Sequence, residues 1–285
     1  MTQSKTVLVT GATGFIGSAT VAILEQAGWK VTKGSRSASQ SMRSGFIFLD
    51  LANPATILAL AKGPCFDAIV HLGAHIGLSE DAESAMFSPN TLSTGCLAYL
   101  ADIWSAYMVY ASTAIVHGVG NEAIDSKSPV CADTAYAKSK WLGEQLLAAS
   151  NARHCILRIA GVFGHDGPAH LGLNRAIAGA IKGVPPSQIG LGAALRNYIY
   201  VKDVAQAVNY ALQERLAGIH LLAGHEVMTV SAMLQKVCVI LAPGLHPLSN
   251  DGAEAMNQVI KPSDYLPKTR RFCEALLDIR KESRQ

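Results

Sequence analysis

The chain has little charge and no long apolar run. Asp, Glu, Lys and Arg make up 16% of its 285 residues, and the formal net charge is +3. No cluster of basic residues with interleaved aromatics appears, which excludes nucleic acid as an expected partner. No apolar run approaches the ~18 residues of a membrane span, and no basic leader precedes "TVLVT". We therefore expect a cytoplasmic protein without a membrane segment, with "KTRR" and "RKESRQ" forming a solvated tail.

The cysteines and histidines lack the spacing of metal sites. The six cysteines include no CxxC pair and have no histidine beside them at ligand spacing. They are expected to be reduced core thiols. His71 and His75 have no carboxylate partner, so His71 is expected to pack at a strand end and no metal is predicted.

What the sequence does have is a regular alternation of short apolar or β-branched runs with longer helical patterns, from "TVLVT" to "CILRIAGVFG". Apolar residues make up 49% of the chain, which suits a sheet covered on both faces. This alternation predicts an α/β fold with a doubly wound parallel sheet. The rhythm breaks after Gly164. We expect a nucleotide-binding body at 1–164 and 196–217 and a small substrate-binding cap at 165–195 and 218–285.

A glycine turn joins the first strand to the first helix in "TVLVTGATGFIGSATVAILEQAG". Gly11, Gly14 and Gly17 let backbone amides approach a pyrophosphate, and the helix N-terminus supplies positive partial charge. Thr10 and Thr13 are expected to add hydroxyl donors. Strand, turn and helix in this order predict a Rossmann-like dinucleotide site.

The segment that ends the second strand selects the cofactor. A carboxylate there binds the adenosine ribose of NAD, whereas a cation accommodates the 2′-phosphate of NADP. The sequence is "KGSRSAS", which offers Lys33, Ser35 and Arg36 and no acidic residue. It favours NADP and leaves NAD possible.

Two Tyr-Lys pairs occur at a spacing of four residues. Tyr136 and Lys140 fall in a helical pattern, where residues i and i+4 share a face, so the lysine can tune the tyrosine and reach a cofactor ribose. Tyr198 and Lys202 fall in "RNYIYVKD", which alternates like a strand and separates them by about 13 Å. We therefore expect Tyr136 and Lys140 to form the acid-base pair.

A hydroxyl partner is expected where the preceding strand ends, because ligands bind outside the carboxyl ends of parallel strands. "MVYASTAIVHG" ends its apolar run with Ser112 and Thr113. Either hydroxyl can bind a substrate oxygen next to Tyr136.

These motifs together resemble the extended branch of the short-chain dehydrogenase/reductase superfamily, in its nucleotide-sugar epimerase, dehydratase and reductase group. The resemblance covers about residues 5–240. It rests on "TGATGFIG", "FLDLAN", "DAIVHLGA", "YASTAIVHG", "YAKSK", "LRIAGVFG" and "RNYIYVKDVAQAV", in family order.

The resemblance implies a role for each matching residue. Thr113, or alternatively Ser112, is the catalytic hydroxyl, with Tyr136 and Lys140 as the acid-base pair. Arg196 holds a substrate phosphate with its bidentate guanidinium. The residues that the resemblance and the glycine turn assign to the cofactor are Gly11, Thr13, Gly14, Phe15, Ile16, Gly17, Arg36, Asp50, Leu51, Leu72, Gly73, Ala74, Tyr136 and Lys140.

The chain departs from the family at two places. Ala114 and Ile115 replace the acidic pair of the 4,6-dehydratases, and His117 stands where relatives have tyrosine. We therefore expect an NAD(P)-dependent oxidoreductase of a nucleoside-diphosphate sugar, either a 4-keto reductase or an epimerase. The alternatives are an NADPH-dependent reductase of a steroid-like or flavonoid-like ketone and a non-catalytic dinucleotide sensor. By resemblance, the helices expected at 90–107 and 134–150 form the interface of a homodimer.

Overall fold

The computed structural model describes residues 4–77 and 82–284. Its main sheet has seven strands in the order β12-β7-β5-β4-β1-β2-β3. Strands β3, β2, β1, β4 and β5 pair in parallel. The strands of this sheet are β1 (Thr6–Thr10), β2 (Lys30–Ser35), β3 (Phe46–Phe48), β4 (Ala68–His71), β5 (Tyr107–Thr113), β7 (Arg153–Ile159) and β12 (Gly218–Leu222). The predicted doubly wound α/β fold is confirmed.

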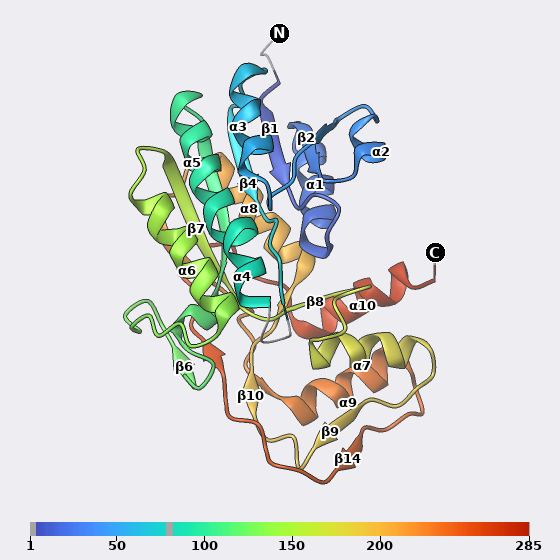
Figure 1. Cartoon of the computed structure of the whole chain (residues 1–285). Coiled ribbons are helices and arrows are strands. Elements are labelled where there is room, and N and C mark those ends of the chain that lie inside the picture. The colour runs from blue at the N-terminus through green and yellow to red at the C-terminus, as the bar shows by residue number, and fades with distance from the viewer. Residues whose placement is uncertain (1–3, 78–81, 285) are drawn as a thin grey trace. The chain divides into compact units, whose positions relative to one another are not determined.

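Helices cover this sheet on both faces. The chain moves from β1 to β3 in one direction and from β4 to β7 in the other, so right-handed crossovers place the connecting helices on opposite faces. Helices α3 (Pro54–Leu58), α5 (Ser93–Ile103) and α6 (Ala135–Ala148) lie side by side (Figure 1). The other elements here are α1 (Phe15–Gln26), α2 (Ala38–Ser41), η1 (Ala59–Lys62), α4 (Ala82–Phe87), the π-helix η2 (Ser88–Leu92), the 3₁₀ helix η3 (Ala114–His117) and α8 (Val201–Glu214).

Local sequence explains where these helices begin. Asn53 caps α3 through the amide of Ala55, and Pro54 occupies the first helical position, where its missing amide costs nothing. Thr134 caps α6 by accepting from the amide of Ala137. Apolar side chains from the strands and helices then form one buried core that includes Leu8, Ile69, Leu97, Met108, Tyr110, Leu147 and Ile156.

The strand order reverses between β1 and β4, and this reversal fixes where a ligand binds. Open parallel sheets bind ligands outside the carboxyl ends of the strands at such a switch point. The turn after β1 and the loop after β4 meet there, because a Cβ on Gly11 would lie 2.6 Å from the amide nitrogen of Gly73. The predicted cofactor residues of both segments therefore lie at one edge of the sheet.

Contact clustering divides the chain into two compact units. The first comprises 1–119, 129–158 and 204–220, and the second comprises 120–128, 159–203 and 221–285. The functional division into a cofactor body and a substrate cap stays a prediction. No helix within the described residues is both long and apolar enough to cross a bilayer.

The second unit combines three helices with short strand pairs. Helix α9 (Val230–Leu241) packs against both α7 (Gly172–Ile181) and α10 (Phe272–Glu282). The strand pairs are β6 (Ala123–Ile124) with β15 (Val259–Ile260), β8 (Val162–Phe163) with β11 (Ile199–Tyr200), β9 (Ser187–Ile189) with β14 (Leu248–Asn250), and β10 (Leu195–Arg196) with β13 (Met228–Thr229).

Two expectations for this unit are wrong. The basic C-terminal segment is not a solvated tail, because α10 buries Phe272, Leu276 and Ile279 and because Arg270 pairs with Asp203. "RNYIYVKD" is not one strand either: β11 ends at Tyr200 and α8 begins at the next residue. Apolar positions at i, i+3 and i+4 along α10 outweigh its basic residues.

Candidate functional site

The glycine turn after β1 is shaped by its own packing. Gly11 has a φ of +65°, which favours glycine, and a Cβ on Gly17 would overlap the carbonyl of Gly11. Thr13 and Gly14 are exposed, and Phe15 and Ile16 begin α1. Helix α1 has no side-chain cap at its N-terminus and no acidic residue in its first turn. Its first amides therefore suit an anionic group.

Thr10 does not serve this turn as a hydroxyl donor. Its Oγ1 is buried, lies 2.6 Å from Nδ1 of His71 and accepts the amide of Gly73. Nε2 of His71 lies 3.2 Å from Oγ1 of Thr94 on α5. Burial lowers the pKa of His71 well below its ordinary value, and the charge of Lys140 acts in the same direction. His71 is thus a neutral brace between β1 and α5, packed at a strand end as expected.

The predicted channel residues surround Gly73. The amide of Leu72 donates to the carbonyl of Thr10, and the side chain of Leu51 lies against Gly73, where a Cβ would overlap it. Ala74 is exposed beside them. Asp50 accepts the amide of Ala52 through Oδ1, which shapes the loop after β3. Within residues 4–77 and 82–284, no three His, Cys, Asp or Glu side chains gather as metal ligands.

Asn90 is a residue that the sequence analysis missed. It is fully buried in η2, accepts the amide of His75 at 2.7 Å and donates to the carbonyl of His75 at 2.8 Å. It also donates to Oγ of Ser139 on α6 at 2.9 Å. Asn90 therefore ties the loop after β4 to the helix of the Tyr-Lys pair. π-turns often occur at functional sites, but no pattern in the sequence predicted the π-helix η2 or the role of Asn90.

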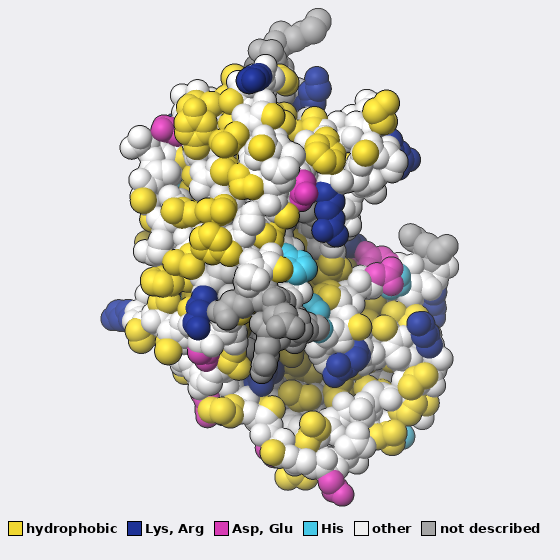
Figure 2. Space-filling view, viewed as in Figure 1, with side chains coloured by type: hydrophobic (Ala, Val, Ile, Leu, Met, Phe, Trp, Pro, Cys, Tyr) yellow, Lys and Arg dark blue, Asp and Glu magenta, His cyan; other side chains and the backbone are white. Residues whose placement is uncertain are grey.

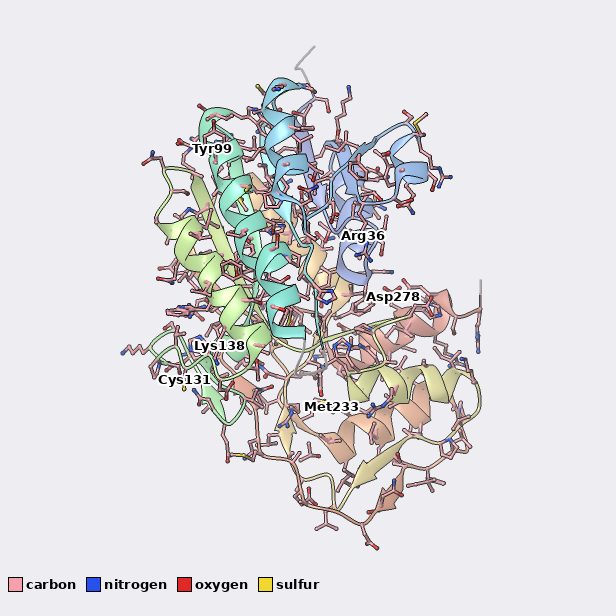
Figure 3. The ribbon with its side chains drawn as sticks, in the orientation of Figure 1. Arg36, Tyr99, Cys131, Lys138, Met233 and Asp278 are labelled. Atoms are coloured by element: carbon pink, nitrogen blue, oxygen red, sulfur yellow. The ribbon has the colours of Figure 1, made fainter. Side chains whose placement is uncertain are left out.

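The residues predicted to select the cofactor lie where β2 ends. Lys33 pairs with Glu25 at 2.9 Å, and Oγ of Ser35 donates to Gln40 at 2.6 Å. Arg36 is exposed where β2 ends (Figure 3), and β2 runs parallel to β1, so this end shares an edge with the glycine turn. Of the three predicted residues, Arg36 is the exposed one, and its contact with a 2′-phosphate stays a prediction.

Tyr136 and Lys140 both lie on α6, in successive turns. The Lys140 side chain is buried, and its Nζ has no hydrogen-bond partner. Burial lowers the pKa of Lys140 to about 7, an effect that the Glu144 carboxylate opposes. Burial raises the pKa of Tyr136 to about 12. Burial alone accounts for this rise, and the tuning of Tyr136 by Lys140 stays a prediction.

Buried polar groups in proteins are nearly always hydrogen-bonded, so this ammonium suits a ligand that supplies hydrogen-bond acceptors. The uncapped N-terminus of α1 and the exposed Thr13 and Gly14 offer donors to a second, anionic part of a ligand. The residues present therefore fit a dinucleotide that carries both a pyrophosphate and a ribose.

Ser112 and Thr113 end β5, but their surroundings differ. The Ser112 hydroxyl donates to Oε1 of Glu144 and is buried. Thr113 caps η3, where its Oγ1 accepts the amide of Ile115 at 3.4 Å, and its hydroxyl proton is not consumed by that bond. The geometry therefore favours Thr113 as the hydroxyl available to a substrate.

Tyr198, Lys202 and Arg196 belong to the second unit. Lys202 donates to Asp278 at 2.8 Å and to Glu282 at 2.6 Å, so it holds α10. NH1 of Arg196 donates to the carbonyls of Leu195 and Met256. Burial raises the pKa of Tyr198, and the charge and hydrogen bond of Arg196 oppose that rise.

A pocket of about 330 Å³ lies within this unit, between α7, α9 and the segment before β9. Most of its lining residues are apolar, and Met233 of α9 is one of them (Figure 3). The pocket also reaches the start of α7 at Gly172, where the helix has no side-chain cap. Its polar or charged lining residues are Arg175, Ser187 and Tyr198. A pocket that combines apolar residues with one cation and a helix N-terminus suits a flat ring joined to phosphate.

Known proteins share this architecture. UDP-arabinose 4-epimerase 1 of Arabidopsis thaliana is 25% identical over 73% of this chain, which spans only 60% of that protein's length. The solved structure of UDP-glucuronic acid 4-epimerase from Bacillus cereus in complex with NAD superposes with a TM-score of 0.82 at 20% identity and covers 98% of this chain and 96% of that one. That of dTDP-4-dehydrorhamnose reductase from Bacillus anthracis in complex with NADP gives 0.81 at 17% identity, with coverage of 98% and 99%.

A family model supports the resemblance that the motifs suggested. The model of the NAD dependent epimerase/dehydratase family matches residues 7–224, which include the glycine turn, Ser112 and Thr113, the Tyr-Lys helix and Arg196. The chain therefore belongs to the NAD dependent epimerase/dehydratase family.

Proposed function

We propose that the protein is an NAD(P)-dependent oxidoreductase of a nucleotide-activated sugar, acting as a 4-keto reductase or an epimerase. The observation that carries this proposal is the buried Nζ of Lys140, which lacks a partner one helical turn from Tyr136. Family membership and the uncapped α1 support the dinucleotide, for which Lys140 would hold a ribose and the first amides of α1 the pyrophosphate.

The nicotinamide of the bound cofactor would supply hydride chemistry at a sugar carbon. The chain's own residues handle the oxygen on that carbon. Thr113 orients the oxygen through its hydroxyl, and Tyr136 moves the proton. A Tyr136 pKa of about 12 keeps the phenol protonated at neutral pH, the form that delivers a proton to a carbonyl oxygen. For the reverse direction, the ammonium of Lys140 favours the phenolate.

In this proposal the second unit binds the nucleotide part of the substrate. We assign the base and ribose to the pocket lined by Leu173, Val230 and Met233. The diphosphate then has Arg175, the uncapped start of α7 and Arg196 as its partners. Tyr198 lines the pocket and contacts Arg196, which connects the two sets of residues.

We further propose NADP as the preferred cofactor, because Arg36 is exposed and the end of β2 carries no carboxylate. We also propose a homodimer formed through α5 and α6. Tyr99 and Ile103 on α5, and Leu142 and Leu146 on α6, are exposed at a spacing of four residues. Figure 2 shows hydrophobic side chains gathered over these helices, an area that a second copy would bury.

Ligand-dependent unfolding tests the function. The unfolding temperature is measured with NADPH or NADH, and then with UDP or dTDP added at saturating NADPH. We expect each dinucleotide and at least one nucleoside diphosphate to raise it. UDP-glucose, UDP-glucuronic acid, UDP-N-acetylglucosamine and dTDP-glucose are then tested for turnover. If dinucleotides raise the unfolding temperature and no nucleoside diphosphate does, the result would favour the alternative function, reduction of a non-nucleotide ketone.

A further inference from the structure

A buried polar network lies behind the proposed catalytic residues. Glu144 receives the hydroxyl of Ser112, and Arg158 on β7 binds the same carboxylate through Nε at 3.1 Å and NH2 at 2.6 Å. NH1 of Arg158 lies 3.0 Å from Nε2 of His117. All four residues are at most 8% exposed. The network is therefore shielded from water, and its bonds are not weakened by solvent.

The direction of each hydrogen bond follows from the groups present. A guanidinium only donates, so Nε2 of His117 accepts from Arg158. Nδ1 of His117 then carries the proton and donates to the carbonyl of Pro129 at 2.9 Å. His117 is consequently neutral, and the Arg158 charge is balanced by Glu144 alone within this network.

Strand β5 and helix α6 contact each other at two points. One is the Ser112–Glu144 bond of this network, and the other is the contact between Tyr110 and Lys140. Tyr110 and Ser112 are two residues apart on β5, so they face the same side of the sheet. Lys140 and Glu144 are four apart on α6, so they share one face of the helix. Nζ of Lys140 lies 4.2 Å from the centre of the Tyr110 ring, and the Tyr110 hydroxyl donates to the Lys140 carbonyl at 3.2 Å.

This contact requires the helix to approach the strand closely. A Cβ on Gly143 would lie 2.5 Å from the Tyr110 hydroxyl and 2.9 Å from the carbonyl of Asn90. A glycine within a helix lowers its stability, but Gly143 allows α6 to approach β5 this closely. The Ser112–Glu144 bond then fixes the next turn of α6.

We propose that Glu144 is a positioning residue, which sets the place and charge state of Lys140 by joining the end of β5 to the following turn of α6. This inference rests on the proposed function, because it concerns the group that would bind the cofactor ribose. It adds a third member to the series Tyr136, Lys140 and Glu144, which occupy successive turns of one helix face.

The charges around Lys140 support this role. Among the described residues, the titratable groups that interact with it or share its helix face are His71 on β4, Tyr110 on β5, and Tyr136 and Glu144 on α6. Burial makes His71 neutral, and burial keeps both tyrosines protonated at neutral pH by raising their pKa values. Glu144 is the anion among these four, so it opposes the loss of the Lys140 proton that burial favours.

The test measures how cofactor affinity depends on pH. NADPH and NADH are titrated by fluorescence from pH 5.5 to 9, with NADH included because it lacks the titrating 2′-phosphate. In the wild type we expect affinity to fall as Lys140 loses its proton. Glu144→Gln should move this midpoint to lower pH by at least about half a unit, which weakens binding about threefold at pH 8.5 and leaves it unchanged at pH 5.5.

Three further variants separate positioning from a purely structural role. Glu144→Asp keeps the negative charge, so the pH midpoint of its cofactor affinity should equal that of the wild type. Asp278→Asn removes a lysine-paired carboxylate in the second unit and should not move it. Glu144→Gln leaves Arg158 buried without its carboxylate and can unfold the protein, so Glu144→Gln combined with Arg158→Met removes both charges. That double variant should show the same acid shift.

The outcomes are distinguishable. A wild type that binds neither dinucleotide overturns the proposed function and this inference with it. A folded Glu144→Gln or double variant that binds NADH with the wild-type midpoint overturns the inference alone. A variant that only lowers the unfolding temperature, with an unchanged midpoint, gives Glu144 a merely structural role and likewise overturns it.

Discussion

The ammonium of Lys140 lies 4.2 Å from the centre of the Tyr110 ring and has no hydrogen-bond acceptor. The aromatic face attracts the cation but replaces only part of its lost hydration. Burial therefore lowers the pKa of this lysine to about 7. A side chain held in this way destabilises the protein on its own and becomes useful when a ligand supplies acceptors.

The first prediction concerns the pH dependence of stability. Lys140 titrates near pH 10.5 when unfolded and near pH 7 when folded, so between these values the unfolded chain binds more protons. The contribution of Lys140 to the free energy of unfolding therefore falls as the pH drops from about 10.5 to 7. We expect Lys140→Met to gain stability over the wild type, with a larger gain at pH 6.5 than at pH 9, in urea unfolding without cofactor.

Lys202 is the matched control. Its ion pairs with Asp278 and Glu282 outweigh burial and raise its pKa above 10.5, so its contribution is fully present at both pH values. Lys202→Met should lose the same amount of stability at pH 6.5 and pH 9. A Lys140→Met gain that does not change between these two pH values would contradict the assigned pKa.

The second prediction concerns proton transfer. Tyr136→Phe should lower kcat by at least about 100-fold with the sugar nucleotide that is turned over, because the general acid is lost. Affinity for the dinucleotide should stay nearly unchanged. Tyr265→Phe changes a tyrosine that is 74% exposed and lies outside the proposed site, and it should leave most of kcat intact. Retention of more than about a tenth of the rate by Tyr136→Phe would exclude this residue as the acid.

The third prediction concerns cofactor choice. Arg36→Ala should weaken NADPH binding and leave NADH binding nearly unchanged, because only NADPH carries the 2′-phosphate. Lys33→Ala is the control, since Lys33 is already paired with Glu25 and lies over the Phe46 ring. Equal affinities of the wild type for the two cofactors, measured by fluorescence titration, would remove the case for NADP.

Periodicity located most of the main sheet and its helices, because local patterns determine these elements. "TVLVT" is buried over four of its five residues as β1, and the apolar positions after Asp133 form α6. Tyr136 and Lys140 lie on one helix because a spacing of four needs no long-range information. The same local rule failed at Lys202, where the change from β11 to α8 occurs within the motif.

Partners from distant parts of the chain could not be predicted. The hydroxyl of Thr10 is bound by His71, 61 residues later, and that of Ser112 by Glu144, 32 residues later. A pattern of residue types does not show which hydroxyl of a Ser-Thr pair has a buried acceptor. One signal was available for Glu144, because it continues the four-residue spacing of Tyr136 and Lys140.

The fourth prediction concerns the oligomer. Leu146→Glu places a charge in the exposed apolar stripe of α6, next to Gly95 of α5. A dimer formed through these helices should dissociate into monomers, which light scattering after size-exclusion chromatography measures. Val239→Glu changes an equally apolar residue on α9 that is 71% exposed, and it should leave the dimer intact. A wild type that is monomeric at micromolar concentration would contradict the interface.

The fifth prediction concerns the substrate diphosphate. Arg196 uses NH1 for the carbonyls of Leu195 and Met256, which fixes the direction of its planar guanidinium without neutralising the charge. A diphosphate carries two negative charges, and burying them without a cation would be costly. Arg196→Leu should therefore abolish most of the rise in unfolding temperature that UDP or dTDP produces at saturating NADPH. Arg196→Lys should restore only part of it, because lysine cannot form two parallel hydrogen bonds.

Arg153→Leu changes an exposed arginine at the start of β7 and should leave the nucleotide response intact. An undiminished response in Arg196→Leu would place the diphosphate on Arg175 and the start of α7 instead.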